Sequence, residues 1–204
     1  MLDRHARGVT TRVFLPVARG LLRAGVSPDA VTVTGTVGVS LGALVFYPLG
    51  ELFWGTIVIT LFVFSDLVDG IMAREAGTTG RWGSFLDSTL DRVQDAAVFL
   101  GVLWWGFGVG DTPTVGVLAA SCMALGMLVS YARAKAESLG FTANVGIAER
   151  AERLVATLVA VGLTGLGLPP VLLTVVLALL ALASVVTVLQ RVAAVRRQAR
   201  ASAA

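Results

Sequence analysis

Apolar residues run along this chain in long stretches that are separated by short segments rich in glycine, proline or charge. A membrane-spanning helix needs about 20 mostly apolar residues, and stretches close to that length recur along the chain. Six of them can be delimited, over residues 30–47, 53–74, 83–107, 114–135, 148–166 and 170–190. The pattern therefore predicts an all-α membrane protein with six transmembrane helices.

Residues 2–25 follow a different pattern, in which apolar positions such as Phe14, Val17 and Leu21 recur at helical spacing with Arg19 and Arg23 between them. An Arg-rich amphipathic stretch of this kind is typical of a helix on the membrane surface, and it lacks the continuous apolar segment of a cleaved signal peptide. We therefore expect residue 1 to be the mature start of a single transmembrane domain over residues 1–204. Its predicted parts are an N-terminal juxtamembrane amphipathic helix (1–25), a six-helix bundle (30–190) and a basic cytoplasmic tail (191–204).

The composition agrees with a membrane location, because 56% of the residues are hydrophobic and only 14% are charged. A soluble domain of this size could not cover its own surface with so little polar material. Lipid is therefore the expected solvent for most of the surface, and no nucleic-acid partner is expected.

The basic residues indicate how the chain crosses the membrane, since Lys and Arg concentrate on the cytoplasmic side. All sixteen lie before the first stretch, at the second or fourth connection, or after the last stretch: Arg4, Arg7, Arg12, Arg19, Arg23, Arg74, Arg81, Arg92, Arg133, Lys135, Arg150, Arg153, Arg191, Arg196, Arg197 and Arg200. The connections near Gly50, Gly110 and Pro169 contain none. We predict a protein of the cell (inner or plasma) membrane with both termini in the cytoplasm.

Aspartates interrupt two neighbouring apolar stretches, Asp66 and Asp69 in the second, and Asp87, Asp91 and Asp95 in the third. A carboxylate at the centre of a membrane helix costs roughly 2.5–3.5 kcal/mol, so such a cluster needs compensating cations and water. A helical turn of about 100° per residue places these carboxylates on one stripe of each helix. The two stripes consist of Asp66, Asp69, Gly70, Ala73 and Arg74, and of Gly83, Asp87 and Asp91. Two antiparallel helices therefore present four carboxylates to one wet pocket near the cytoplasm.

Three interpretations of this pocket compete. The aspartates could simply pair with Arg74, Arg81 and Arg92, but these bases are too few to neutralise them while also facing water. A cation-coupled transporter also places carboxylates in the membrane, although its site is usually near the midplane and this acidic pair is not repeated in the second half. The third interpretation is a pair of Mg²⁺ or Mn²⁺ ions, which prefer oxygen ligands and leave positions open for substrate phosphates.

The metal interpretation also explains the small residues on the two stripes. Gly70, Ala73 and Gly83 would let a bulky ligand approach the backbone beside the carboxylates. Arg74, on the same stripe, offers a cationic fork for a phosphate group. By helix packing alone, Gly70 and Ala73 could instead be ordinary close-contact residues.

The complete motif Asp66-x2-Asp69-Gly70-x2-Ala73-Arg74-x8-Gly83-x3-Asp87-x3-Asp91 resembles the signature of the CDP-alcohol phosphotransferase family, with every defined position filled. The resemblance implies a six-helix homodimer that uses Mg²⁺ or Mn²⁺ and lets an alcohol hydroxyl displace CMP. It also implies that Asp66, Asp69, Asp87 and Asp91 are metal ligands and that Asp91 is the general base. The CMP half of the donor lipid would lie over Gly70, Ala73 and Gly83, with Arg74 on phosphate.

Residues 28–32 resemble the nucleotide-contacting entry to the first span in the same family, which would add Asp29 and Thr32 to the donor site. An ordinary helix N-cap by Ser27 or Asp29 is an equally good interpretation of this segment.

Beyond the motif, almost the whole chain from Arg19 onward resembles the actinobacterial phosphatidylinositol phosphate synthases within this family. The similar segments are residues 19–23, 130–137, 149–153 and 190–191, with departures at Arg133, Lys135 and Ala151. The resemblance implies CDP-diacylglycerol as donor and inositol 1-phosphate as acceptor, with glycerol 3-phosphate as the alternative. The predicted acceptor-phosphate residues are Arg133, Lys135, Arg150, Arg153 and Arg191. Each of them could also be present only because Lys and Arg favour the cytoplasmic side.

Overall fold

The computed structural model describes residues 2–202, with side-chain surroundings from Val13 onward, and this part of the chain is helical without strands. Met1 and residues 203–204, the ends of the predicted surface helix and tail, lie outside the described residues. The elements are α1 (Leu2–Arg23), α2 (Pro28–Leu41), the π-helix η1 (Gly42–Phe46), α3 (Leu52–Val63), α4 (Ser65–Glu75), α5 (Arg81–Phe107), α6 (Pro113–Ser138), α7 (Arg150–Gly165) and α8 (Pro170–Ala201).

Four of these helical segments are long and apolar enough to cross a membrane: Pro28–Phe46, Leu52–Glu75, Pro113–Ser138 and Pro170–Ala201. The other two predicted spans correspond to α5 and α7. Helix α5 is long enough but carries Asp91, Arg92 and Asp95 in its middle, and α7 has only 16 residues, so these two helices do not meet the length and apolarity expected of a spanning helix.

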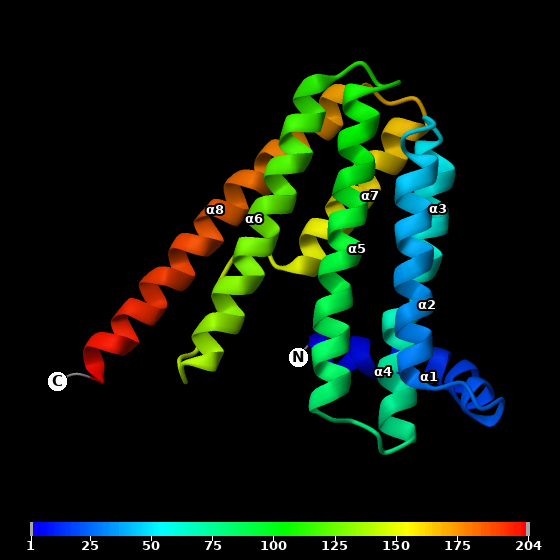
Figure 1. The fold of residues 1–204 in the computed structure, drawn as a ribbon, viewed down its shortest axis with the longest axis vertical. Helices are drawn as coiled ribbons and strands as arrows, with labels where there is room; N and C mark the ends of the chain where they lie inside the picture. Colours follow the sequence, from blue (N-terminus) through cyan, green and yellow to red (C-terminus); the bar gives the residue numbers. More distant parts are fainter. Residues whose placement is uncertain (1, 203–204) are drawn as a thin grey trace.

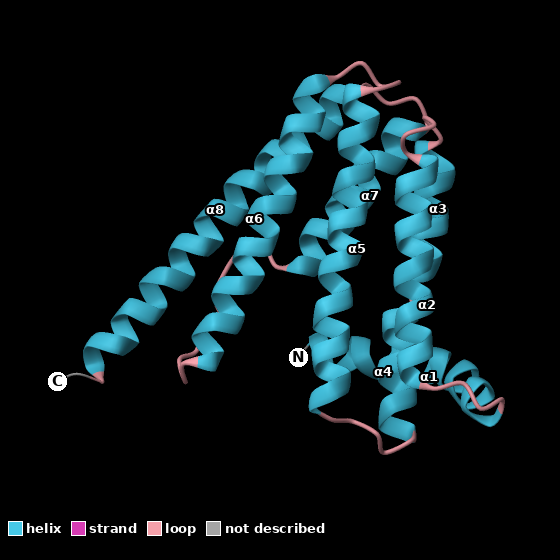
Figure 2. Ribbon diagram, in the orientation of Figure 1, coloured by secondary structure: helices cyan, strands magenta, loops and turns pink. Residues whose placement is uncertain are grey.

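Most connections between the helices lie near the top or the bottom of the molecule in Figure 1, whereas α7 begins between these two ends. The connections near Gly50, Gly110 and Pro169 lie together at the top of this view, while α1, α4 and the α4–α5 connection lie at the bottom. Figure 2 shows that short loops make these connections. The three connections without basic residues are therefore at the end opposite the aspartate-bearing turns.

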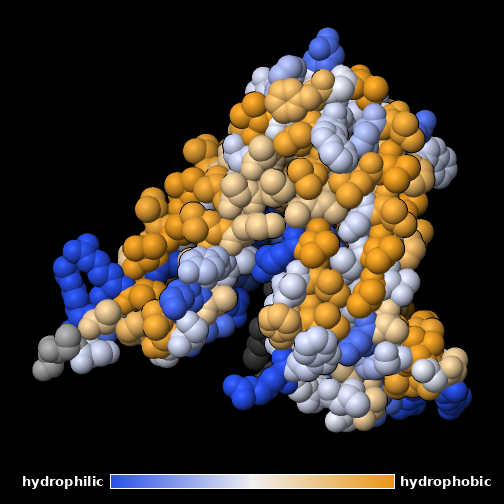
Figure 3. Space-filling model, viewed as in Figure 1, coloured by the Kyte–Doolittle hydropathy of each residue, from blue (hydrophilic) through white to orange (hydrophobic). Residues whose placement is uncertain are grey.

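Buried apolar side chains from α2, α3, α5, α6, α7 and α8 form one core, which includes Tyr47, Ile59, Phe99 and Leu173. The outer faces of α6, α8 and the α2–α3 pair are mostly hydrophobic, whereas hydrophilic side chains gather at the lower end and in the hollow between α5 and α6 (Figure 3). A bundle that exposes apolar side chains along its length is suited to lipid rather than to water.

The predicted span over residues 53–74 is a helix pair rather than one helix. The regular helix stops at Phe64, where ψ is −15°, and Ser65 Oγ donates to the Phe62 carbonyl oxygen at 2.6 Å. Helix α2 crosses close to this break, because a Cβ at Gly35 would overlap the Ser65 side chain and one at Gly38 would overlap the Phe62 ring. Small residues on α2 therefore position the start of α4, and with it Asp66.

The predicted helix before the first span is present as α1. Ala18 on α1 is buried against Val68, Ile71 and Met72 of α4, and Arg19 Nε pairs with Glu75 Oε2 at 2.9 Å. This contact places α1 against the outside of α4.

Candidate active site

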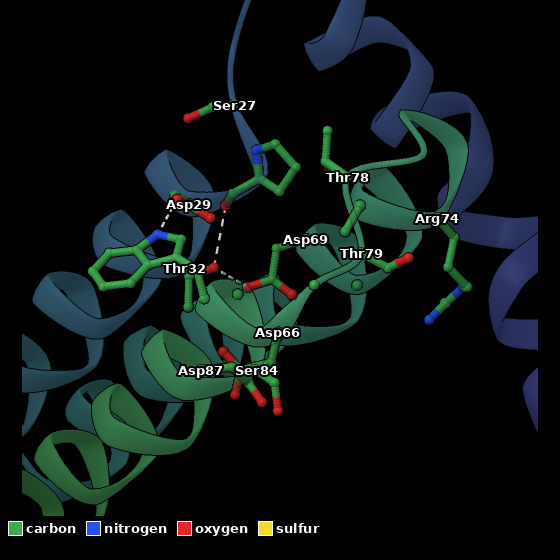
Figure 4. A pocket seen from close by; sticks show the side chains of 16 residues that line it. Ser27, Asp29, Thr32, Asp66, Asp69, Arg74, Thr78, Thr79, Ser84 and Asp87 are labelled. Atoms are coloured by element: carbon green, nitrogen blue, oxygen red, sulfur yellow. Dashed lines mark hydrogen bonds between the residues drawn. The ribbon is translucent and has the colours of Figure 1, made fainter.

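A cavity of about 580 Å³ opens between the start of α2, helix α4 and the start of α5 (Figure 4). It contains six predicted donor-lipid residues and three predicted metal ligands. Its lining comprises Ser27, Pro28, Asp29, Thr32, Asp66, Asp69, Gly70, Ala73, Arg74, Thr78, Thr79, Gly80, Trp82, Gly83, Ser84 and Asp87. The cavity therefore joins the two helical stripes to the entry of α2, residues that are far apart in the sequence.

The glycines of the motif border open space rather than packed helices. A Cβ added at Gly83 would meet no heavy atom within 4 Å, and one at Gly70 would meet only Arg74 Nη1, at 3.6 Å. Close helix packing therefore does not explain either residue. Their missing side chains instead widen the cavity beside Asp66 and Asp87.

The start of α2 is tied to both aspartate-bearing helices. Ser27 Oγ caps α2 by accepting from the Ala30 backbone N–H at 3.2 Å, so Asp29 is free for a different contact. Asp29 Oδ2 accepts from Trp82 Nε1 at 2.9 Å, and both residues line the cavity. Thr32 Oγ1 donates to Asp69 Oδ2 at 2.5 Å. Asp29 and Thr32 thus face the cavity instead of serving only the helix end.

Asp91 lies outside the cavity lining and faces α7. Its Oδ1 atom is 2.8 Å from Arg150 Nη1, and its Oδ2 atom is 3.4 Å from Arg92 Nη2. Arg150 also pairs with Asp95 Oδ1 at 3.1 Å and lies 3.5 Å from Asp66 Oδ2. One guanidinium from α7 therefore links carboxylates of α4 and α5.

The other predicted acceptor residues fall into two groups. Arg153 is 1% exposed and donates to the Ala148 carbonyl and to Asp95, while Arg191 is 3% exposed and donates to the carbonyls of Val145 and Val129. Arg133 instead pairs with Glu137 at the surface, and Lys135 is exposed. The structure brings Arg150 and Arg153 together around Asp95 and leaves Arg133 and Lys135 outside that cluster.

Two polar residues of this cluster were given no role in the sequence analysis. Gln94 and Asp95 are buried and both contact Arg150. Their spacing could have identified them, because Gln94 and Asp95 follow Asp91 by three and four residues and so continue the helix face of Asp87 and Asp91. Trp82, Thr78 and Thr79 also line the cavity, and no periodicity singles them out because two of them lie in the α4–α5 connection.

The donor chemistry of the site fits a divalent cation. Carboxylates are hard oxygen ligands, and Asp66 Oδ2 is a buried carboxylate oxygen without a hydrogen-bond partner. Among the described residues, however, no three Asp, Glu, His or Cys side chains converge as a preformed metal site. Asp91 is held by Arg150, so side-chain rotation would have to accompany binding of an ion by the whole set.

The chain is similar to proteins of known activity along most of its length. A family model described as CDP-alcohol phosphatidyltransferase matches residues 25–189. The phosphatidylinositol phosphate synthase of Streptomyces avermitilis is 56% identical over 204 residues, which cover 97% of this chain and 84% of that protein.

Solved structures of the Mycobacterium tuberculosis phosphatidylinositol phosphate synthase have the same fold. The crystal structure with CDP-DAG bound has a TM-score of 0.85 and 43% identity, over 90% of this chain and 94% of that chain. The crystal structure in complex with manganese and citrate has a TM-score of 0.83 and 42% identity, over 89% and 88% of the two chains.

Proposed function

Because the chain belongs to the CDP-alcohol phosphatidyltransferase family, we propose that it transfers the phosphatidyl group of CDP-diacylglycerol to inositol 1-phosphate, releasing CMP and forming phosphatidylinositol phosphate. It is a multi-pass membrane protein and a metal-dependent enzyme. The observation that carries the proposal is the cavity in which Asp66, Asp69 and Asp87 lie beside Gly70 and the start of α2.

The aspartates have two roles in the transfer, which are to hold the metal ions and to accept a proton. Two Mg²⁺ or Mn²⁺ ions held by Asp66, Asp69, Asp87 and Asp91 would neutralise the charge that develops on the transferred phosphoryl group. The acceptor hydroxyl oxygen forms a bond to the phosphatidyl phosphorus, while the bond from that phosphorus to the CMP oxygen breaks. Asp91 accepts the hydroxyl proton as general base, and CMP leaves with the electron pair.

The donor lipid occupies the cavity. Its CMP half lies over Gly70, Ala73 and Gly83, where missing or small side chains leave room, and Arg74 binds phosphate at the cavity wall. Asp29 and Thr32 contact the nucleotide from the start of α2.

The acceptor phosphate binds on the other side of Asp91, among Arg133, Lys135, Arg150, Arg153 and Arg191. A phosphomonoester with nearly two negative charges suits this basic group better than an uncharged alcohol does. Glycerol 3-phosphate carries the same phosphate and is therefore the alternative acceptor.

The deciding experiment supplies the purified protein with CDP-diacylglycerol, Mn²⁺ and either acceptor, and identifies the lipid product by mass. We expect phosphatidylinositol phosphate and stoichiometric CMP. Phosphatidylglycerophosphate as the main product would replace the proposed acceptor, and CMP release without any acceptor would contradict the transfer itself.

Replacing Arg153 by glutamine is expected to raise the KM for inositol 1-phosphate by about 10- to 100-fold, because a charge-assisted hydrogen bond to phosphate is lost. Since Arg153 is buried and paired with Asp95, the unfolding temperature in detergent should fall as well. Arg197→Gln, an exposed site on the tail of α8, is the matched control. A changed KM for CDP-diacylglycerol with an unchanged acceptor KM would place the acceptor site elsewhere.

We further propose that all six predicted helices cross the membrane, with α1 on its surface and with the active site, both termini and the tail on the cytoplasmic side. In a Cys122→Ala background, cysteines placed at Gly50, Gly110 or Leu168 should react with an impermeant reagent applied outside intact cells. Cysteines at Gly77, Asn144 or Ser202 should react only after permeabilisation. The reverse labelling would place the site away from the cytoplasm.

The enzyme is also proposed to be a homodimer, as the family resemblance implies. Cross-linking in native membranes followed by mass determination of the purified species tests this point. A monomer at all protein concentrations would contradict it.

A further inference from the structure

Gln94 lies on α5 between two groups of opposite charge. The residue is 1% exposed, so its amide has to find its hydrogen-bond partners within the protein. Its Nε2 group donates to Asp66 Oδ1 at 3.3 Å and to Thr36 Oγ1 at 3.1 Å. Its Oε1 atom accepts from Arg150 Nη2 at 2.9 Å.

The neighbours of Gln94 determine which way its amide points. The opposite orientation would set Oε1 against the Asp66 carboxylate and Nε2 against the Arg150 guanidinium, and both contacts would be repulsive. A charged side chain could satisfy only one of the two neighbours. An uncharged amide, with a donor at one atom and an acceptor at the other, satisfies both.

The contact with Asp66 has a consequence for the other oxygen of that carboxylate. Gln94 occupies Oδ1, whereas Oδ2 is buried without a hydrogen-bond partner. The rotation of the carboxylate is therefore set by Gln94, and Oδ2 is left with only the ion pair to Arg150 Nη1 at 3.5 Å.

The contact with Arg150 similarly orients the guanidinium. Gln94 binds Nη2 and Asp95 binds Nε at 3.1 Å, so the remaining nitrogen, Nη1, points to Asp91 Oδ1 at 2.8 Å. The guanidinium group is planar and rigid, so fixing two of its nitrogens also fixes the position of the third.

We propose that Gln94 is a positioning residue that aligns Asp66 on the metal side of the site and Arg150 on the acceptor side at the same time. In this role Gln94 acts through these two side chains and needs no contact of its own with substrate or metal. The inference rests on the proposed function for the roles of Asp66 and Arg150, but the hydrogen bonds that carry it do not depend on the identity of the acceptor.

The test compares wild-type protein with Gln94→Leu, which keeps a similar volume and removes both the donor and the acceptor. The concentration of Mn²⁺ needed for half-saturation, measured from the electron paramagnetic resonance signal of the free ion, is expected to rise about 10-fold. In the transfer assay the KM for inositol 1-phosphate should rise and kcat should fall, each about 10-fold, while the KM for CDP-diacylglycerol changes less than about twofold.

Gln94→Glu separates the two contacts. Its carboxylate still accepts from Arg150, so the acceptor KM should stay within about twofold of wild type, while repulsion of Asp66 still lowers kcat about 10-fold. If Gln94→Leu does not fold, Gln94→Glu alone still tests the positioning role of Gln94. A Gln94→Glu protein with wild-type kcat, or with the acceptor KM of Gln94→Leu, would overturn the proposal.

Ser184→Ala is the matched control for a buried polar side chain outside the site, because Ser184 is fully buried on α8 and donates only to the Leu180 carbonyl. It should change the unfolding temperature without changing Mn²⁺ affinity or either KM. If Gln94→Leu behaves in the same way, Gln94 is merely structural and the proposal is wrong. Failure of the proposed function has a different signature: the wild-type protein would then form no lipid product with inositol 1-phosphate, whatever residue occupies position 94.

Discussion

Asp91→Asn is expected to reduce kcat for phosphatidyl transfer by about 10²–10⁴-fold, because the amide cannot accept the proton of the attacking hydroxyl. The fold should persist, since Arg150 keeps its contacts with Gln94 and Asp95 when the Asp91 carboxylate is lost. The measurement is CMP release under saturating CDP-diacylglycerol, inositol 1-phosphate and Mn²⁺.

The matched control for this variant is Asp111→Asn, the same substitution at an exposed position in the α5–α6 connection. It should turn over like wild type, since this connection lies at the end of the molecule opposite α4 (Figure 1). An Asp91→Asn enzyme with kcat within about tenfold of wild type would exclude Asp91 as the general base, because such a base contributes more than that.

Asp87→Asn should abolish activity because a metal ligand is lost, whereas Asp91→Asn acts by removing the general base. Charge stabilisation by a bound ion contributes several kcal/mol at the transition state, so loss of a ligand is expected to lower kcat by about 10²-fold or more. Asp87 is exposed in the cavity, so the substitution should barely affect folding. Titration of free Mn²⁺ should show weaker binding, and raising the Mn²⁺ concentration should restore part of the activity.

Glu51→Gln provides a matched loss of one exposed carboxylate at the start of α3, far from the cavity, and should leave Mn²⁺ binding unchanged. Removal of divalent ions by a chelator should stop the wild-type enzyme, and added Mn²⁺ should restart it. Full activity in chelator, or unaltered Mn²⁺ binding by Asp87→Asn, would refute the assignment of Asp87 as a metal ligand.

The sequence alone predicted the helical character of the chain, and most of the residues that line the cavity were singled out from it. Lengths of apolar stretches predict helices because a spanning segment must satisfy its own backbone hydrogen bonds. Helical structure is present in each predicted stretch, and four of the helical segments are long and apolar enough to span a membrane. The stripe of Asp66, Asp69 and Gly70 follows from helical periodicity, which depends only on spacing within one segment. Such local rules, together with the family motif, anticipated Asp66, Asp69 and Asp87 in the cavity lining.

Other features required the tertiary structure. The break at Phe64 accompanies the close approach of α2 at Gly35 and Gly38, which a hydropathy pattern does not contain. Trp82 reaches Asp29 over 53 positions of sequence, and Arg150 reaches Gln94 over 56.

Helical periodicity predicts which side chains share a helix face, and the excess of Lys and Arg on one side of the membrane predicts roughly where cations lie. Neither states which carboxylate a particular guanidinium meets. That choice depends on how the start of α7 approaches the middle of α5, because ion pairs and hydrogen bonds require distances of a few ångströms that only the assembled bundle defines. The sequence by itself therefore determined the helices and the acidic stripes, whereas the assembled bundle decided that Arg150, held by Gln94 and Asp95, faces Asp91.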